Sequence, residues 1–467
     1  MKKVSLYFIS TTFLSGLLTA QNVNFVEASG SPINAGTSSL RGFASGDLNG
    51  DGKKDFVIGN SYANTLSIFL GNGAGQFSHA NGSPLASGSG PIYTVIADFN
   101  NDQVPDISTA NYEDGNISIK LGTGNGTFIN GPMPTISTGG WAYCIDSKDF
   151  NLDGNMDLVT VAALTGKVYV FLGDGTGNFL TAPGSPYNVG IEPNHVSTGN
   201  FNSDNNPDFV VANGNSSTIS VFLGNGSGGF SQAPGSPYEA GYEPRTISVK
   251  DINNDSRSDL IVANGTGNDV SLFFGQTDGS FVEAPGSPIA TGQYAYQTAI
   301  ADFNSDGQQD ISVTNGLDDE VMFFLGSGTG SFTNADNSPI AVGTNPQPIC
   351  TDDFDGDGKP DVLVGHFLSQ DVIVLLNKNP VGISVPTKSR NLNAFPNPAK
   401  DGVRINVQNF QQGMVMIVFD AVGKEVDRVS VSSADFLYPG KNLAKGIYVF
   451  GIYFNNIELG SGKIIFE

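Results

Sequence analysis

Short loops rich in aspartate and asparagine recur seven times in this chain of 467 residues, and each begins 51 residues after the one before it. Counted from its first residue, each loop carries Asp or Asn at positions 1, 3, 5 and 9. Oxygen ligands at such spacing suit Ca²⁺, which takes six to eight hard oxygen ligands in flexible geometry. We therefore expect up to seven calcium sites. The candidate ligands are Asp47, Asn49, Asp51, Asp55, Asp98, Asn100, Asp102, Asp106, Asp149, Asn151, Asp153, Asp157, Asn200, Asn202, Asp204, Asp208, Asp251, Asn253, Asp255, Asp259, Asp302, Asn304, Asp306, Asp310, Asp353, Asp355, Asp357 and Asp361.

These loops are not EF-hands, which need Glu at position 12. In the first loop, position 12 is Ile58, inside an apolar run, so aspartate at position 9 takes the closing role. The alternative is a set of Asx turns that hold the backbone without metal. Seven copies in register would then leave many like charges without a counterion, which favours the metal interpretation.

The loops are expected to differ in affinity. Four of them keep Gly at position 6, which permits the positive φ of a sharp turn; the other three have Gln103, Asn205 and Ser256 there. The loop that begins at Asn200 has two carboxylates and is expected to bind most weakly. The loop that begins at Asp353 has four and is expected to bind most tightly.

The residues between the loops predict the elements that position them. Each loop leads into an apolar run, a second apolar run, a Gly-rich turn, and two short segments that lead to the next loop. Four strands in each unit of about 50 residues are typical of a propeller blade. We predict an all-β fold: a seven-bladed β-propeller over residues 21–377 closed by the N-terminal strand, plus a small C-terminal β-sandwich.

Closure is predicted from the two ends of the repeat array. The seventh unit stops after its third strand, near residue 376, whereas residues 21–46 read like the missing part of a unit: NFVEASGSPINAG resembles QFSHANGSPLASG. A strand donated by the N-terminus removes both free sheet edges. The alternative is an open solenoid, which needs distinct capping repeats, and the chain shows none.

The pattern D-F-N-x-D-G-x-x-D, a strand, and then S-V-F-L-G-x-G-x-G-x-F resembles the FG-GAP/VCBS repeat family of calcium-binding β-propellers. The resemblance covers residues 21–377. It implies a Ca²⁺ in each loop between the first and second strands of a blade. It also implies extracellular adhesion or glycan binding, although some members are attached to enzymes.

The two ends of the chain resemble export signals. Residues 1–20 have Lys2 and Lys3 followed by an apolar run, as in a secretory signal peptide; the alternative, a transmembrane anchor, needs a longer run. Residues 378–392 form a predicted linker. Residues 393–467 resemble the C-terminal sorting domain of the Bacteroidetes type IX secretion system, through Phe395-Pro396-Asn397-Pro398, Gly423-Lys424-Glu425-Val426 and Gly446-Ile447-Tyr448.

Phe395 departs from the usual Tyr of that family. The alternative is an ordinary terminal sandwich domain. The resemblance implies contact with the type IX secretion machinery, removal of this domain, and release from, or attachment to, the outer-membrane surface of a Gram-negative, Bacteroidetes-like cell. No membrane span is expected in the mature protein.

Composition excludes one class of partner. The net charge is −23, and the isoelectric point is near 4.3. Nucleic-acid binding rewards basic surfaces, so a nucleic-acid partner is not expected. The two cysteines, Cys144 and Cys350, lie in non-equivalent positions of different repeats. We expect two free thiols rather than a disulfide, because the two residues lie three units apart in a ring of seven, too far for the required Cα separation.

Strand direction alternates within a blade, so the metal loops and Gly-rich turns are expected on one face. The opposite face receives aromatic and polar residues that suit a sugar or a peptide. We expect Trp141 and Tyr143 at its rim and Tyr93 and His195 at the mouth of the central channel. The alternative is that these residues only pack the blade tops. The candidate ligand-binding residues are Tyr93, Trp141, Tyr143, His195, Arg245 and Tyr296.

Two functions remain from the sequence. The first is a non-catalytic binding or adhesion module for a glycan or an extracellular protein, with no catalytic residues. The second is a polysaccharide lyase that uses His195, Tyr93 or Arg245 as base and charge stabiliser. The chain has no nucleophile motif, no phosphate-binding loop and no His/Cys zinc cluster, which favours the binding module.

Overall fold

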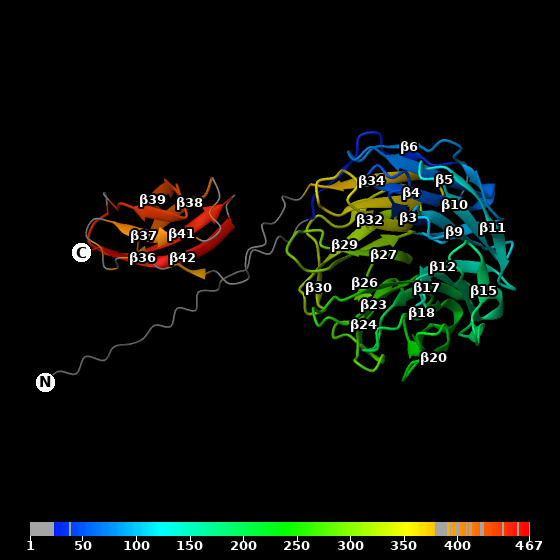
Figure 1. The fold of residues 1–467 in the computed structure, drawn as a ribbon. Helices are drawn as coiled ribbons and strands as arrows, with labels where there is room; N and C mark the ends of the chain where they lie inside the picture. The colour runs from blue at the N-terminus through cyan, green and yellow to red at the C-terminus, as the bar shows by residue number, and fades with distance from the viewer. Residues whose placement is uncertain are drawn as a thin grey trace. The chain divides into compact units, whose positions relative to one another are not determined.

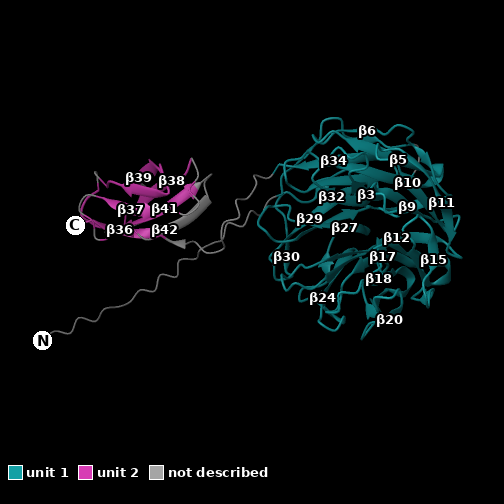
Figure 2. Ribbon diagram, viewed as in Figure 1, with its two compact units in different colours: residues 1–381 teal, residues 382–467 magenta. Residues whose placement is uncertain are grey.

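The computed structural model describes residues 23–36, 39–378 and 390–466, the last range with short gaps at 393, 396, 398, 400–401, 408–409, 411–412, 421–424, 441–442 and 455–456. The expected signal peptide and most of the expected linker lie outside the described residues. The chain divides into two compact units, residues 1–381 and 382–467 (Figure 2). Within the described residues, no helix is long and apolar enough to cross a membrane.

The first unit consists of seven antiparallel sheets arranged around a common centre (Figure 1). The innermost strands of neighbouring sheets contact one another in chain order, and the last of them contacts the first. This contact between the two ends of the array is the one that an open solenoid lacks. The innermost strands are β3 (Leu40–Gly46), β8 (Pro91–Ala97), β12 (Ala142–Lys148), β17 (Pro193–Gly199), β22 (Pro244–Lys250), β27 (Ala295–Ala301) and β32 (Pro346–Asp352).

The second strand of every sheet begins at the last aspartate of a metal loop and is buried along its whole length. A continuous apolar run is typical of such a strand, because both of its faces pack against neighbouring sheets. These strands are β4 (Asp55–Asn60), β9 (Asp106–Asn111), β13 (Asp157–Ala162), β18 (Asp208–Asn213), β23 (Asp259–Asn264), β28 (Asp310–Asn315) and β33 (Asp361–His366).

The third strands pair with the second ones. In some sheets a one-turn 3₁₀ helix connects the two strands: η1 (Ser61–Ala63), η2 (Ala163–Thr165) or η3 (Gly214–Ser216). Each third strand runs back toward the metal-loop face, where a Gly-rich turn follows in the first six sheets. The third strands are β5 (Thr65–Gly71), β10 (Asn116–Gly122), β14 (Lys167–Gly173), β19 (Thr218–Gly224), β24 (Asp269–Gly275), β29 (Glu320–Gly326) and β34 (Asp371–Asn377).

The outer edge of a sheet is a three-residue strand followed by a Ser-Pro turn and a two-residue strand, and both strands pair with the third strand. The second sheet differs: Gly131-Pro132-Met133-Pro134 replaces that turn, and β11 (Phe128–Ser137) is one continuous strand. The other outer strands are β6 (Phe77–His79), β7 (Leu85–Ala86), β15 (Phe179–Thr181), β16 (Tyr187–Asn188), β20 (Phe230–Gln232), β21 (Tyr238–Glu239), β25 (Phe281–Glu283), β26 (Ile289–Ala290), β30 (Phe332–Asn334) and β31 (Ile340–Ala341).

The N-terminal segment supplies the outer edge of the seventh sheet. Strand β1 (Phe25–Glu27) pairs with β34 so that Phe25 lies opposite Asn377, and β2 (Ile33–Asn34) pairs with the other end of β34. The pairing of the N-terminal segment with the seventh unit, which the sequence predicted, is thus present at Phe25–Glu27 and Ile33–Asn34. Val23 is fully buried beside this strand, so the contact is part of the core as well as of the ladder.

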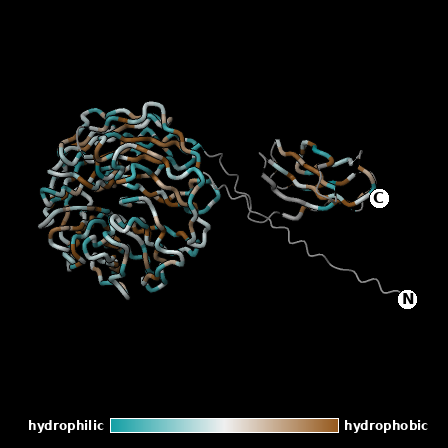
Figure 3. Tube along the Cα trace, turned by 180° about the vertical axis from the view of Figure 1, so that it is seen from behind, coloured by the Kyte–Doolittle hydropathy of each residue, from teal (hydrophilic) through white to brown (hydrophobic). Residues whose placement is uncertain are grey.

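Neighbouring sheets are joined by aromatic pairs. A buried residue at position 2 of a metal loop contacts the Phe that opens the outer strand of the next sheet, as in Phe99 with Phe179, whose ring centroids lie 5.7 Å apart. The pair of Phe303 with Phe25, at 5.8 Å, is the equivalent contact made to the N-terminal strand. Figure 3 shows hydrophobic positions along the strands and hydrophilic positions in the loops.

In its described residues, the second unit contains a five-stranded and a three-stranded sheet whose buried side chains form one hydrophobic cluster. The first sheet has the order β35 (Arg390–Asn391), β42 (Ile457–Phe466), β41 (Gly446–Phe454), β38 (Val415–Phe419) and β39 (Glu425–Ser430). The second has the order β36 (Ala394–Phe395), β37 (Val403–Asn406) and β40 (Asp435–Tyr438). The cluster contains Ile405 of the small sheet and Met416 and Ile452 of the large one.

Candidate metal loops and the opposite face

All seven aspartate-rich loops lie between the first and second strands of a sheet, as expected. Gly-rich turns lie beside the metal loop of the preceding sheet: the N–H of Gly126 donates to the carbonyl oxygen of Leu48 at 3.1 Å, and the N–H of Gly177 donates to that of Phe99 at 3.0 Å. The loops and turns therefore share one face of the ring, which is the arrangement that alternating strand direction predicts.

The aspartate at position 9 anchors each loop. In the first loop, one oxygen of Asp55 accepts the N–H of Leu48 and the other accepts the N–H of Gly71, both at 2.8 Å. The same two bonds occur in the other six loops at 2.7 to 3.0 Å. Each position-9 carboxylate thus joins the loop to the end of the third strand, a structural role beyond the ligand role expected for it.

The aspartate at position 1 shapes the turn. Asp47 accepts the N–H of Gly50, Asp51 and Gly52 at 2.8 to 3.1 Å. Position 6 has positive φ in all seven loops, including Gln103 at 66° and Ser256 at 66°. Residues other than Gly adopt this conformation at a free-energy cost, so the three loops without Gly keep the same turn under mild strain.

The loop that begins at Asn200 differs from the other six. Asn200 is exposed, whereas the six aspartates at this position are half-buried. Its backbone is drawn toward the neighbouring Gly-rich turn: Asn202 forms an isolated β-bridge with Asp278, and the hydroxyl of Ser203 donates to the carbonyl oxygen of Thr277 at 3.4 Å. The expectation that this loop is the poorest metal site stays a prediction, to which the exposure of Asn200 adds a structural reason.

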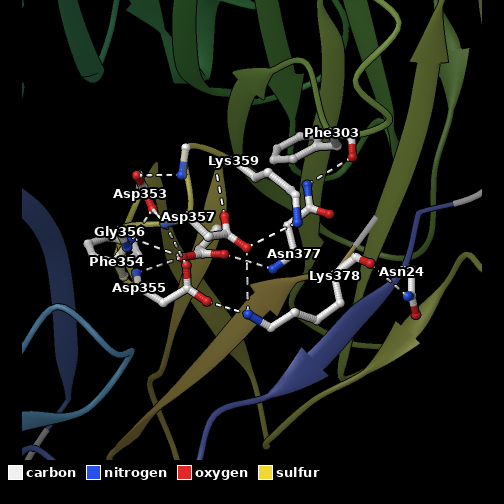
Figure 4. A network of polar contacts seen from close by, with 12 residues as sticks. Asn24, Phe303, Asp353, Phe354, Asp355, Gly356, Asp357, Lys359, Asn377 and Lys378 are labelled. Carbon is white, nitrogen blue, oxygen red and sulfur yellow. Dashed lines mark hydrogen bonds and ion pairs between the residues drawn. The ribbon is translucent and has the colours of Figure 1, made fainter. Parts of the chain in front are cut away.

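The loop that begins at Asp353 gathers the most charge. Side-chain oxygens of Asp353, Asp355 and Asp361 all lie within 4.8 Å of one another, the one such acidic group in the described part of the chain. Two lysines also reach this loop: Lys359 lies 3.0 Å from Asp357, and Lys378 forms an ion pair with Asp355 and lies 3.7 Å from Asp357 (Figure 4).

The donor set fits a hard divalent cation. Burial raises the pKa of the position-9 carboxyl groups, to about 6 in Asp106 and to about 7 in Asp310, and in these two loops the charges at positions 1 and 5 raise it further. The loops therefore hold negative charge in excess of what their backbone hydrogen bonds stabilise. Carboxylate and amide oxygens around a sharp turn are the ligands that Ca²⁺ prefers.

The opposite face holds a connected group of the expected ligand-binding residues. Arg245 donates to the hydroxyl of Tyr143 at 3.2 Å, and its guanidinium carbon lies 5.8 Å from the centre of the Tyr296 ring. Tyr112 packs between Tyr143 and Trp141, with ring centroids at 5.6 and 5.1 Å. Trp141 is 38% exposed, so this chain of contacts reaches the surface.

Tyr93 and His195 do not stand at an open mouth, which corrects the expectation. Both are buried, and their rings meet edge to face with centroids 5.1 Å apart, although they belong to the second and fourth sheets. The reason is that inward-pointing side chains of a narrow ring meet across its centre. Burial lowers the pKa of His195 to about 3, and its Nδ1 accepts the N–H of Ile247, so the ring is neutral.

Comparison with known families decides the relationship. The model of the FG-GAP-like repeat matches residues 47–108, 98–160, 149–211, 200–262, 251–313 and 302–364. The chain belongs to the FG-GAP-like repeat family. A second model, the secretion system C-terminal sorting domain, matches residues 393–467. That domain indicates export by the type IX system of Bacteroidetes to the cell surface or beyond, and contact with the machinery of that system.

Solved structures show the same fold in distant proteins. BBS1N, solved in complex with ARL6DN, is 14% identical, with a TM-score of 0.53 over 76% of this chain and 98% of its own. The periplasmic gluconolactonase PpgL of Pseudomonas aeruginosa is 15% identical, with a TM-score of 0.50 over 66% of this chain and 86% of its own. No curated protein matches the chain in sequence.

Sequence reasoning missed one residue of the opposite face. Arg41 donates to the hydroxyl of Tyr296 and to the side-chain oxygen of Gln347, each at 2.6 Å, and stacks over Phe367 at 4.4 Å. A signal for it existed in the FG-GAP-like repeat itself, because Arg41 and Arg245 both stand six residues before the first aspartate of a metal loop.

Proposed function

We propose that this FG-GAP-like protein is a seven-bladed β-propeller, closed by β1, that calcium stabilises through its seven aspartate-rich loops. It acts outside the cell, released or held at the surface, as a non-catalytic binding module for a glycan or an extracellular protein. The C-terminal unit is a β-sandwich that serves export and is removed afterwards. The calcium assignment rests on the recurrence of Asp and Asn at positions 1, 3, 5 and 9 of the loops, on the convergence of Asp353, Asp355 and Asp361 in one of them, and on the excess negative charge of the loops.

One observation carries the binding function: a continuous group of aromatic and basic side chains on the face opposite the metal loops. Trp141, Tyr112, Tyr143 and Arg245 contact one another in sequence, and Trp141 opens the group to solvent. Sugars stack on exposed aromatic rings through their C–H faces, while nearby polar groups bond their hydroxyls. Aromatic and Arg side chains are also the residues that dominate protein interfaces.

The burial of His195 and Tyr93 supports a binding role over a lyase. A general base must lie within hydrogen-bond reach of the proton that it removes. His195 has its pKa lowered to about 3 by burial, and Nδ1 already accepts a backbone N–H. Burial also raises the pKa of Tyr93 well above its usual value. Neither group suits proton abstraction from a substrate at neutral pH.

A glycan array, run with and without a calcium chelator, tests the proposal. We expect binding in calcium that is lost in Trp141→Ala and retained in Leu180→Ala, which removes an exposed apolar side chain from β15. Calcium-dependent melting should be unchanged in both variants. Loss of binding on altering the metal-loop face instead would show that the wrong face was chosen. Growth of unsaturated-uronate absorbance with an acidic polysaccharide would establish the lyase.

A further inference from the structure

One layer of side chains surrounds the channel on the face opposite the metal loops. Its members stand six residues before the first residue of each metal loop, on the seven innermost strands. Of the three arginines between residues 39 and 378, two belong to this layer. The layer consists of Arg41, Ile92, Tyr143, Asn194, Arg245, Tyr296 and Gln347.

The two arginines meet at one aromatic ring. The guanidinium carbon of Arg41 lies 5.9 Å from the centre of the Tyr296 ring, and that of Arg245 lies 5.8 Å from it. Both side chains are only partly buried, so solvent or a ligand can reach them. Arginine stays charged at any accessible pH, so two positive charges share this small region of a chain whose net charge is −23.

The two cations are not equally compensated. Arg245 forms an ion pair with Glu243 and hydrogen bonds with the hydroxyls of Tyr294 and Tyr143. Arg41 bonds only to neutral oxygens, those of Tyr296 and Gln347, and among the residues that the structure describes no carboxylate forms an ion pair with it. The Nε–H of Arg245 is buried and also has no hydrogen-bond partner there.

A partly buried cation without a counterion is costly unless a ligand supplies one. A guanidinium binds a carboxylate through two parallel hydrogen bonds and stacks on aromatic faces. Resting on the binding function proposed above, we infer that this layer recognises a carboxylate, and that the ligand is an acidic sugar, a uronic acid residue of a glycan.

A cavity beside the two arginines indicates the kind of molecule to which the carboxylate belongs. Its volume is about 300 Å³, and it is lined by Tyr294, Leu317, Asn345, Gln347, Phe367 and Leu368. Three of these residues contact the arginines: Gln347 and Phe367 contact Arg41, and Tyr294 contacts Arg245. The volume is at the small end for ligand pockets, which suits one or two sugar residues.

The lining favours a sugar over an acidic peptide. The rings of Phe367 and Tyr294 offer flat faces for the C–H side of a pyranose. Amides of Asn345 and Gln347 lie beside them, and amides donate to and accept from hydroxyl groups.

Calorimetric titration of the full chain at fixed calcium concentration tests the inference. The probes are trigalacturonic acid, its methyl ester, a neutral trisaccharide, a sulfated disaccharide and a short Glu-rich peptide. We expect the acid to bind at least about tenfold more tightly than its ester, since a hydrogen bond to a charged group is worth about that much. Added salt should weaken the binding of the acid and leave that of the ester unchanged.

Arg41→Gln should lower the affinity for the acid about tenfold or more and leave that for the ester unchanged. Arg257→Gln is the matched control, because it removes the same charge from the metal-loop face, where Arg257 pairs with Asp255. Arg41→Lys keeps the charge without the paired geometry and should recover only part of the affinity. If Arg41→Gln does not fold, Arg41→Lys serves as the test variant, and its calcium-dependent melting shows whether it is folded.

Each other outcome contradicts the inference in a distinct way. Equal binding of acid and ester, or equal effects of Arg41→Gln and Arg257→Gln, would overturn carboxylate recognition and leave the binding module in place. Preference for the sulfated disaccharide would assign a sulfate ligand, and preference for the peptide a protein one. If none of the probes binds, but another glycan or a protein binds and Trp141→Ala abolishes that binding, the inference about the carboxylate is overturned and the proposed binding function stands. Binding of nothing at all would overturn both.

Discussion

The ammonium group of Lys378 forms an ion pair with Asp355 in the most acidic of the seven loops. Lys378 follows directly after β34, and its backbone N–H donates to the carbonyl oxygen of Asn24 at 2.7 Å, beside β1 (Figure 4). Lys378 thus contacts both the candidate metal site and the N-terminal segment where β1 pairs with β34. A fixed cation there offsets part of the charge that would attract calcium.

Removal of Lys378 should therefore strengthen calcium binding. We expect Lys378→Met to melt lower than the wild-type protein in EDTA, because Asp355 and Asp357 lose a counter-charge. We also expect this loop to bind calcium about tenfold more tightly in the variant than in the wild-type protein, because the positive charge of Lys378 no longer repels the ion. Melting curves against free Ca²⁺ measure both effects. Lys120→Met, which removes a lysine bonded only to Asn130, should show neither.

Metal removal should lower the stability of the whole ring. Each site filled at 100 times its dissociation constant adds about 2.7 kcal/mol to the free energy of unfolding. The melting temperature should accordingly rise with free Ca²⁺ and fall in excess EDTA. An unchanged melting curve after confirmed metal removal would contradict the calcium assignment for these loops and leave the Asx-turn interpretation.

The seven loops should not contribute equally. Asp357→Ala removes a candidate ligand from the loop in which three other carboxylates converge, whereas Asp204→Ala acts on the loop whose first residue, Asn200, is exposed. We expect Asp357→Ala to cause the larger loss of calcium-dependent stability, measured by denaturant titration at fixed free calcium. Equal losses would show that neither the number of carboxylates nor their convergence sets the affinity.

The repeat period made most of the fold predictable. A spacing of 51 residues with apolar runs at fixed offsets predicts the three inner strands of each sheet, the place of the metal loops, and the pairing of the N-terminal segment with β34. The single outer strand expected for each unit is correct only for the second sheet, because a Ser-Pro turn divides the outer edge of the others into two strands. Positive φ at position 6 was harder to predict for Gln103 and Ser256, because the local cost of that conformation is outweighed by the hydrogen bonds of the loop aspartates.

The parts that could not be predicted depend on contacts across the ring. Alternation along a strand shows that Tyr93 and His195 point inward, but not that they meet, because that depends on the width of the channel. Lys378 stands where the other six units have Asn72, Thr123, Asp174, Asn225, Gln276 and Ser327, which open a Gly-rich turn. The seventh unit lacks this turn, so the equivalent residues of the other units do not predict the position of the Lys378 side chain.

The N-terminal strand should be energetically essential, through Phe25 in particular. Its ring stacks on Phe323 with centroids 4.7 Å apart and meets Phe303 edge to face. We expect Phe25→Ala to lower the free energy of unfolding by about 2 kcal/mol, less than a fully buried Phe would cost, because Phe25 is partly buried. Val26→Ala, which truncates a side chain that is 50% exposed on the same strand, should cost well under about 1 kcal/mol. Similar small losses for both would show that β1 contributes little to closure.

The neutral His195 should make the protein sensitive to acid. Its pKa is about 3 in the folded state because of burial, against an ordinary value of 6.5. The unfolded state therefore takes up a proton as the pH falls below 6.5, while the folded state does not do so until near 3. Stability contributed by this group is complete above pH 6.5 and is lost as the pH falls toward 3.

Between pH 8 and pH 5 this proton uptake amounts to about 2 kcal/mol. His195→Asn keeps an acceptor near the N–H of Ile247 and cannot titrate. We expect the wild-type protein to lose about 2 kcal/mol more than the variant over that interval, measured by denaturant unfolding at fixed calcium so that the loop aspartates contribute equally to both. Parallel stability profiles for the two proteins would show that the pKa of His195 in the folded state is close to its ordinary value, which contradicts the lowering by burial.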